Sequence, residues 1–305
     1  MNFRWFTLIV CFFCFYVIPG ITHAQGRRLQ SIEPAKPDEI KEFLLSGDAE
    51  KIYRALIVKD APQLRPAMKP LWKFLSQEKD TAFRVRDRTV KGYHMVNVLP
   101  LVRKELAGYG ADSYELIDQG FQSKEIRKRV EACRVSGLLI AKDNQFFRRL
   151  ITASEDDHGF VRIAALRALP VYGKDAINPL FRRLKRCSAW QKGGKFSFEE
   201  IDAICRSLKD LDEFASDILP KLAPYLDRGL APDAIVKTIA EAGKRLSYSN
   251  EPETTKLILP AFQRLKRQGI LAQDAEYLQQ RYNSRMKIEQ GSAHQSTTRS
   301  ESKSK

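Results

Sequence analysis

Apolar and polar positions recur along the chain in a phrase that predicts stacked helices. Residues 144–150 read Asn-Gln-Phe-Phe-Arg-Arg-Leu, and residues 178–184, 34 positions later, read Asn-Pro-Leu-Phe-Arg-Arg-Leu. Looser copies are centred on Pro70, Pro100, Pro220 and Pro260. The six copies lie 30 to 45 residues apart, a period typical of repeat arrays.

A second apolar series runs in step with the phrase and lies about twenty residues before each copy. Its anchors are Ile52, Val85, Ile126, Val161, Ile201 and Ile235. Two series in step indicate two short helices and a turn in each unit. We therefore expect an all-α fold, an α-solenoid of about six αα-hairpins with helical caps.

The phrase itself predicts a buried and an exposed side. Large apolar residues fall one, two and five places after its Pro position, which puts them on one helical stripe. The bases fall three and four places after it, on the other side. They are Lys73, Arg103, Lys104, Arg148, Arg149, Arg182, Arg183 and Arg264. This pattern predicts either a ladder of positive charge for a partner or ordinary solvation of an outer face.

The best-formed unit resembles a HEAT repeat, especially the HEAT-like variety of phycobilisome-lyase-type proteins. The resemblance rests on Asp156 in a turn, on Val161 and Arg162 opening the next helix, and on the small residues that follow in Ile-Ala-Ala-Leu-Arg-Ala. Asp80, Val85 and Arg86 repeat the motif, whereas the unit at Ile126 lacks the turn Asp and those at Ile52, Ile201 and Ile235 lack the Arg.

The resemblance covers roughly residues 48 to 270 and implies a fold more than an activity, because HEAT repeats serve many functions. In that family the Pro-bearing helix usually lies on the convex side. The resemblance thus implies a concave side that displays Arg86, Arg88, Arg127, Lys128 and Arg206.

The first 24 residues resemble a signal peptide. A short positive start at Arg4 precedes an apolar run from Trp5 to Ile18, and small residues at Thr22 and Ala24 suit cleavage after Ala24. We expect an exported protein, periplasmic or secreted, with an uncleaved membrane anchor as the alternative. The rest divides into a polar lead over 25–36, the array over 37–289 and a disordered Ser- and Lys-rich tail over 290–305.

The formal net charge of +15 favours acidic partners such as anionic glycans, acidic proteins or lipid headgroups. Export makes nucleic acid a less available partner. One loop over 187–196 combines Trp190 with Lys192 and Lys195, an arrangement that can stack on a ring while it holds an anion. The alternative is that Trp190 folds back as a lid over the end of a hairpin.

Candidate chemistry is sparse. His94 and His158 lie in no metal-ligand spacing, and no catalytic motif or cofactor fingerprint is found. We interpret the acidic cluster from Glu155 to His158 as a turn whose carboxylates cap the next helix and pair with Arg162, with metal binding as the alternative. Cys187 and Cys205 are the candidate disulfide in an exported chain, against separate buried thiols.

These patterns predict a non-enzymatic binding or scaffold protein with a macromolecular partner and no cofactor. A polyanion binder that uses the Arg and Lys ladder is the first alternative. An enzyme of the HEAT-like lyase or glycosylase type is the second.

Overall fold

A computed structural model describes residues 33–58, 65–77, 81–87, 92–139, 142–187, 198–226, 233–249, 252–269, 271–284 and 287. The expected signal peptide and tail lie outside this part. The chain is mostly helical and forms two compact units, residues 1–105 and residues 106–305. Across the described ranges, none of the helices combines the length and the apolar character needed to cross a membrane.

In the described part of the first unit, the helices before the strands are α2 (Ile40–Leu45), α3 (Ala49–Leu56) and α4 (Met68–Ser76), the last preceded by the 3-10 turn η3 (Arg65–Ala67). The carboxylate of Asp48 caps α3 by accepting from the Lys51 amide at 2.9 Å, since the first turn of a helix leaves amides without partners. The buried faces carry Phe43 of α2, Ile52 of α3 and Leu71 of α4.

The expected helix at Val85 is wrong, because this segment forms a β-hairpin. Strand β1 (Ala82–Asp87) pairs antiparallel with β2 (Gly92–Asn97), with Val85 opposite His94. The match of Val85 and Arg86 to a HEAT motif concealed an alternation of apolar and charged residues with period two, which is typical of a strand. The ring of Phe83 in β1 packs edge-on against Tyr53 of α3, 5.4 Å between centroids.

The second unit is built from helices that pack on one another. Helix α5 (Leu99–Gly108) contains the boundary between the two units, which lies after Glu105, and leads into η4 (Gly110–Ser113). The helices that follow are α6 (Tyr114–Phe121), α7 (Ile126–Ser136), α8 (Asn144–Ala153), α9 (Gly159–Ala168), α10 (Ile177–Cys187), α11 (Phe198–Lys209), α12 (Ala215–Leu222), α13 (Asp233–Ser249) and α14 (Pro252–Arg267). Short 3-10 segments η5 (Leu169–Ala176), η7 (Asp212–Phe214) and η8 (Ala223–Tyr225) lie between them. A last described helix covers 272–284.

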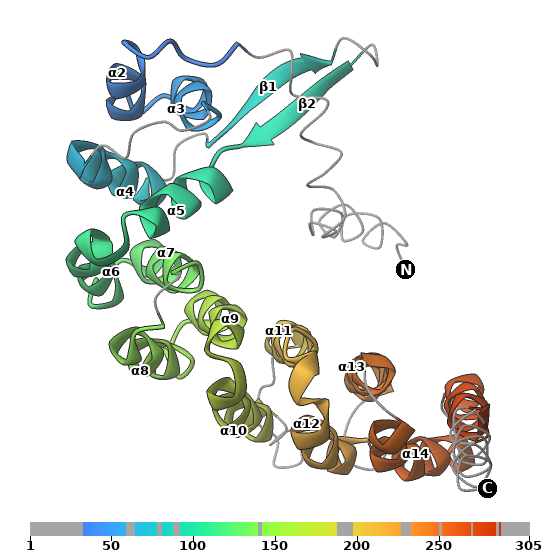
Figure 1. The fold of residues 1–305 in the computed structure, drawn as a ribbon. Helices are drawn as coiled ribbons and strands as arrows, with labels where there is room; N and C mark the ends of the chain where they lie inside the picture. Colours follow the sequence, from blue (N-terminus) through green and yellow to red (C-terminus); the bar gives the residue numbers. More distant parts are fainter. Residues whose placement is uncertain are drawn as a thin grey trace, which may run out of the picture. The chain divides into compact units, whose positions relative to one another are not determined.

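These helices lie in two rows (Figure 1). One row is α7, α9, α11 and α13, each packed on the next. The other contains α8, α10, α12 and α14, of which α12 packs on α14, while α8 and α10 both contact η5. In the second row, α8, α10 and α12 each pack also against the helix that follows them in the chain, and α14 packs against α13, which precedes it.

The repeated phrase supplies the core of the second row, as its pattern predicts. Phe146 and Leu150 of α8 and Leu180 and Leu184 of α10 are all fully buried. The second series is less regular. Val161 and Ile201 are buried, but Ile126 is 39% exposed at the start of α7, so its assignment as a core anchor is wrong.

Small residues let the helices of the first row approach closely. Gly137, which caps the C-terminus of α7, lies so near α9 that a Cβ placed on it would be 2.9 Å from the Cβ of Ala168. That separation is shorter than carbon atoms tolerate without a shift. Gly137 is therefore required by helix packing, and its backbone angles would suit any residue.

Candidate partner-binding face and the charged network beside it

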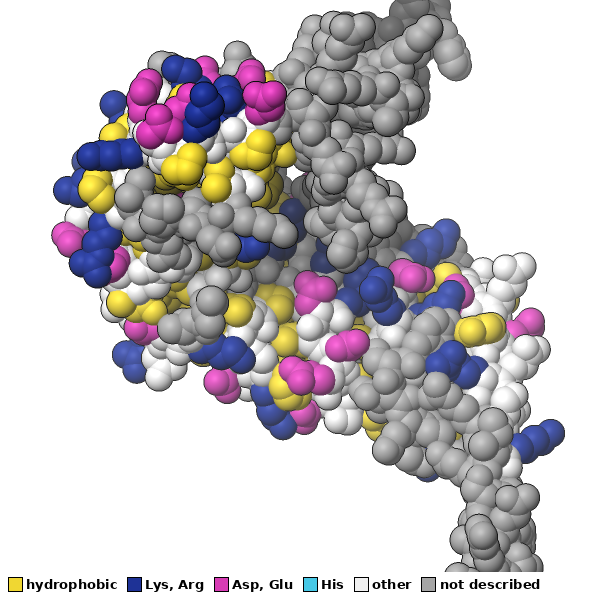
Figure 2. Space-filling model, turned by 45° about the horizontal axis from the view of Figure 1, so that its top comes forward, with side chains coloured by type: hydrophobic (Ala, Val, Ile, Leu, Met, Phe, Trp, Pro, Cys, Tyr) yellow, Lys and Arg dark blue, Asp and Glu magenta, His cyan; other side chains and the backbone are white. Residues whose placement is uncertain are grey.

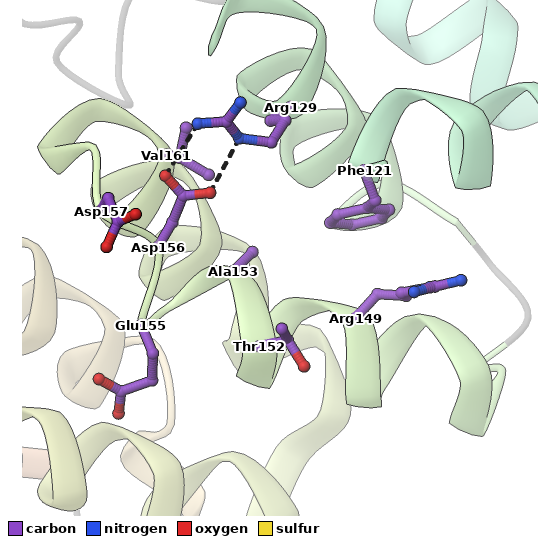
Figure 3. A pocket seen from close by; sticks show the side chains of 9 residues that line it. All are labelled: Phe121, Arg129, Arg149, Thr152, Ala153, Glu155, Asp156, Asp157 and Val161. Carbon is purple, nitrogen blue, oxygen red and sulfur yellow. Dashed lines mark hydrogen bonds and ion pairs between the residues drawn. The ribbon is translucent and has the colours of Figure 1, made fainter. Parts of the chain in front are cut away.

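A pocket of about 330 Å³ lies beside the turn between α8 and α9 (Figure 3). It is lined by Phe121, Arg129, Arg149, Thr152, Ala153, Glu155, Asp156, Asp157 and Val161. Arg149 points away from the turn and binds Asp118 of α6, with Nε 2.7 Å from Oδ1. The Thr152 hydroxyl donates to the Arg148 carbonyl at 3.1 Å. These polar groups of the lining already form hydrogen bonds within the protein, so their role is to join helices.

Arg129 of α7 ties two hairpins together at one edge of this pocket. Its Nη1 donates to the carbonyls of Ser123 and Lys124, in the turn before α7, at 3.0 and 3.1 Å. Its Nε and Nη2 donate to the carboxylate of Asp156, after α8, at 2.8 and 3.0 Å. Burial alone would raise the pKa of Asp156, but the hydrogen bonds from Arg129 and from the His158 amide outweigh it and lower that pKa.

Arg162 of α9 repeats the same arrangement one hairpin later. Its Nη1 donates to the carbonyls of Asp156 and Asp157 at 2.7 and 2.9 Å. Its Nε donates to Glu200 of α11 at 2.8 Å. Both arginines are the fourth residue of their helix. The structural equivalent of Arg162 is therefore Arg129 rather than Arg127, which the family motif selected.

Glu200 is the centre of this network. It is 1% exposed and binds two guanidinium groups, because Arg183 of α10 donates to its Oε2 from Nε at 2.9 Å and from Nη2 at 2.5 Å. Arg183 also binds Glu155 at 3.1 Å. Burial opposes ionisation of Glu200, yet the hydrogen bonds from Arg162 and Arg183 lower its pKa. Three successive helices of the chain are thereby joined through one carboxylate.

The acidic turn from Glu155 to His158 binds other parts of the protein, but its partners differ from those expected. Arg162 donates to backbone carbonyl oxygens of this turn. The carboxylates bind other arginines: Asp156 pairs with Arg129, and Glu155 pairs with Arg183 and Arg186. No side chain of the turn caps α9, whose N-cap residue is His158. Within the described ranges, no group of three His, Cys, Asp or Glu side chains is placed to hold a metal ion.

The twin arginines of the repeated phrase have two different environments. The second of each pair, Arg149 or Arg183, is half-buried and holds a carboxylate. The first, Arg148 or Arg182, is exposed and forms no ion pair with another described residue. Of the eight bases of the predicted ladder, Arg149 and Arg183 are consequently part of the packing between hairpins.

A different row of arginines lies on the exposed side of the first row of helices. Superimposing the burial patterns of α7, α9, α11 and α13 aligns positions that lie 33, 39 and 39 residues apart. The aligned exposed residues are Arg134, Arg167, Arg206 and Arg245. We call these four residues the arginine row. The side chains of Arg134 and Arg206 keep 45% and 47% of their surface exposed, although each has an acidic neighbour on its own helix.

Other aligned positions of the same helices do not repeat one residue type. One turn before the arginine row, the equivalent residues are Val130, Ile163, Asp202 and Glu241. Two turns before it they are Arg127, Phe160, Glu199 and Thr238. Phe160 is 69% exposed. Of the concave set expected from the family, only Arg206 belongs to the row, while Arg86 lies in β1 and Arg88 lies outside the described residues.

The sequence lacked an obvious signal for the arginine row, because its spacing differs from that of the repeated phrase and its members have unlike neighbours. Aligning the uncharged positions Ala132, Ala165, Ile204 and Gly243 would have recovered it. These positions are buried in each helix.

The cysteines of the second unit are separate thiols. Cys133, Cys187 and Cys205 are buried and free, so the considered bridge between Cys187 and Cys205 is not formed. The Cys187 thiol lies 3.4 Å from Glu200 Oε2. Burial and the nearby Glu200 charge raise the pKa of Cys187 to about 12, and burial raises that of Cys205 to about 12.

The loop with Trp190, Lys192 and Lys195 lies outside the described residues, and its proposed role stays a prediction. Comparison of the chain with models of protein families finds no match, and comparison with curated proteins finds none either.

Proposed function

We propose that this chain is an exported α-solenoid of the HEAT-like type that binds a macromolecular partner and catalyses no reaction. The support for the fold is the packing of α7 on α9, α9 on α11 and α11 on α13, with a second row of helices beside them. Stacked hairpins of this kind provide extended surfaces that partners use. The support for export is the expected signal peptide over residues 1–24.

The observation that carries the binding role is the arginine row. A surface without a specific partner does not require the same residue type at each equivalent position, as the varied set Arg127, Phe160, Glu199 and Thr238 illustrates. Arginine at the same exposed position of four neighbouring helices in the first row is more specific than solvation requires. Guanidinium groups also bind carboxylates and other anions through paired donors. We assign the partner to this side of α7, α9, α11 and α13, called the row face from here on.

A site-specific photocrosslinker tests the proposal. Benzoylphenylalanine in place of Ile163, between Phe160 and Arg167 on α9, should crosslink the partner in the native envelope or medium. The matched control replaces Arg148, an exposed residue of α8 in the other row. We expect a specific adduct from the α9 position only. Equal adducts from both positions, or none from either, would reject the row face as the binding surface.

A polyanion binder is the second candidate, and it is favoured by the net charge of +15. However, Lys and Arg are interspersed with Asp and Glu on the side shown in Figure 2, rather than gathered in one field. Densely charged chains bind through released counterions, so their affinity falls steeply with salt. Heparin that binds tightly with such a salt dependence, and more tightly than any acidic peptide, would favour this candidate.

A further inference from the structure

The spacing of the arginine row limits the shape of an anionic partner. Neighbouring packed helices lie about 8–10 Å apart. The row therefore presents one guanidinium about every 8–10 Å across α7, α9, α11 and α13. A partner that engages all four needs anionic groups on one side at about that interval.

A polyproline II segment meets this requirement. It has three residues per turn and rises about 3.1 Å per residue, so every third side chain returns to the same side after about 9 Å. A β-strand returns side chains to one side every second residue, about 6.6 Å apart, which falls between two arginines. A helix that lies across the row would place its residues i and i+7 about 10.5 Å apart. Because these residues do not stay on one straight line along the helix, such a helix would contact no more than two of the arginines.

The chemistry of the row face also fits a protein segment. Exposed helix faces have their backbone groups paired internally, and a polyproline II chain needs no backbone partner because water solvates it. Apolar side chains, Phe160 and the partly exposed Ile163, lie beside Arg167 on α9. Proline rings can pack on them. The acids Asp202 and Glu241 lie one turn before Arg206 and Arg245 on the same helices, beside the row, and would repel a chain that is charged at every position.

We infer that the arginine row binds a proline-rich acidic protein segment in the polyproline II conformation, with a carboxylate at every third residue. This inference rests on the proposed function and specifies its partner. Each carboxylate would lie opposite one guanidinium of Arg134, Arg167, Arg206 or Arg245, which can bind it through two parallel hydrogen bonds.

The test uses two labelled peptides of the same composition in fluorescence anisotropy. One is five repeats of Glu-Pro-Pro, and the other has the five glutamates placed together at one end. The protein variants are R167Q/R206Q/R245Q and the control R148Q/R182Q/R264Q, which removes three exposed charges from the other row. Arg134 is retained because its partner Glu131 is buried at 2% exposure. Urea unfolding confirms that both variants are folded.

We expect the repeating peptide to bind the wild type more tightly than the clustered one. The first variant should weaken binding about tenfold, because three exposed ion pairs are lost, and the control should weaken it less than about twofold. Equal affinity for the two peptides, or equal loss in the two variants, would overturn the inference. If the peptides fail while Ile163 still crosslinks a partner, the inference is wrong and the proposed function stands. If neither the peptides nor the crosslinker gives binding, both are wrong.

Discussion

The Nε atom of Arg162 donates to the Glu200 carboxylate at 2.8 Å, although 38 residues separate the two in the chain. This contact joins α9 to α11, and Arg183 of α10 completes it at 2.9 Å from its own Nε. The carboxylate is nearly inaccessible, at 1% exposed. Two cations and one anion therefore depend on each other in a region where water cannot replace a missing partner.

Replacing Glu200 with Gln should strongly destabilise the second unit. The change leaves Arg162 and Arg183 without their carboxylate, and breaking a buried pair costs about 3–5 kcal/mol. Urea unfolding monitored by circular dichroism measures the loss. The control is Asp202→Asn, which breaks the more exposed pair with Arg206 and should cost less than about 1 kcal/mol. Similar losses in the two variants would show that the Glu200 network contributes little.

Stability should fall as the medium becomes acidic. The pKa values of Glu200 and Asp156 are lowered in the folded protein from ordinary values of 4.5 and 3.8. The unfolded chain therefore binds protons more readily at these sites, and their contribution is complete above the ordinary values and lost as the pH falls through the lowered ones. The free energy of unfolding, measured between pH 7 and pH 3, should decrease below about pH 4.5.

The E200Q variant provides the contrast for that titration. It should show a shallower decline with acid than the wild type, because one of the two linked carboxylates is gone. An identical pH profile in both proteins would assign the acid sensitivity to other groups.

Substituting Gly137 with Val should separate α7 from α9. Even the first added carbon would meet the Cβ of Ala168 at 2.9 Å, and overpacking a tight contact typically costs about 1–3 kcal/mol. Thermal unfolding should show a lower midpoint. Gly159→Val is the matched control, since a Cβ there meets nothing closer than the Arg162 guanidinium at 3.6 Å. An unchanged midpoint in G137V would contradict the close approach of the helices.

The three buried cysteines should react slowly with a thiol reagent in the folded protein. Their thiols are inaccessible, and the pKa values of Cys187 and Cys205, about 12, leave almost no thiolate at pH 8. Peptide mapping after brief alkylation should find Cys133, Cys187 and Cys205 unmodified until denaturant is added. Recovery of a Cys187–Cys205 cross-linked peptide without reductant would contradict the structure.

The repeated phrase allowed the core of α8 and α10 to be predicted, because side chains at helical spacing report burial directly. Phe146, Leu150, Leu180 and Leu184 follow that rule. The hairpin at Val85 could not be predicted from the family motif, since a pair such as Val-Arg suits the start of a helix and the middle of a strand equally well.

The charged residues were harder to assign than the apolar ones. Arg148 and Arg149 are adjacent in sequence, yet one is exposed and the other holds Asp118. The difference depends on a carboxylate 31 residues away, and periodicity alone contains no information about such a partner. The arginine row was missed for a related reason. The spacing of its members in the sequence depends on the lengths of the connections between helices as well as on the helices themselves.

The double attachment of Arg129 and Arg162 has a consequence for how such a chain can change in evolution. Each guanidinium binds the turn of its own hairpin and the carboxylate of the following one. Deleting the hairpin α8–α9 would set Arg129 against Glu200, and duplicating it would set Arg162 against a second Asp156. In both cases an arginine would meet an acid at a different place in its hairpin from the acid that it binds now. Exchange of repeats would keep these pairs only if the chain were divided within a hairpin, so that each arginine stayed in the same segment as the carboxylate it binds. The segment that could be gained or lost as a unit would then be the junction between two hairpins.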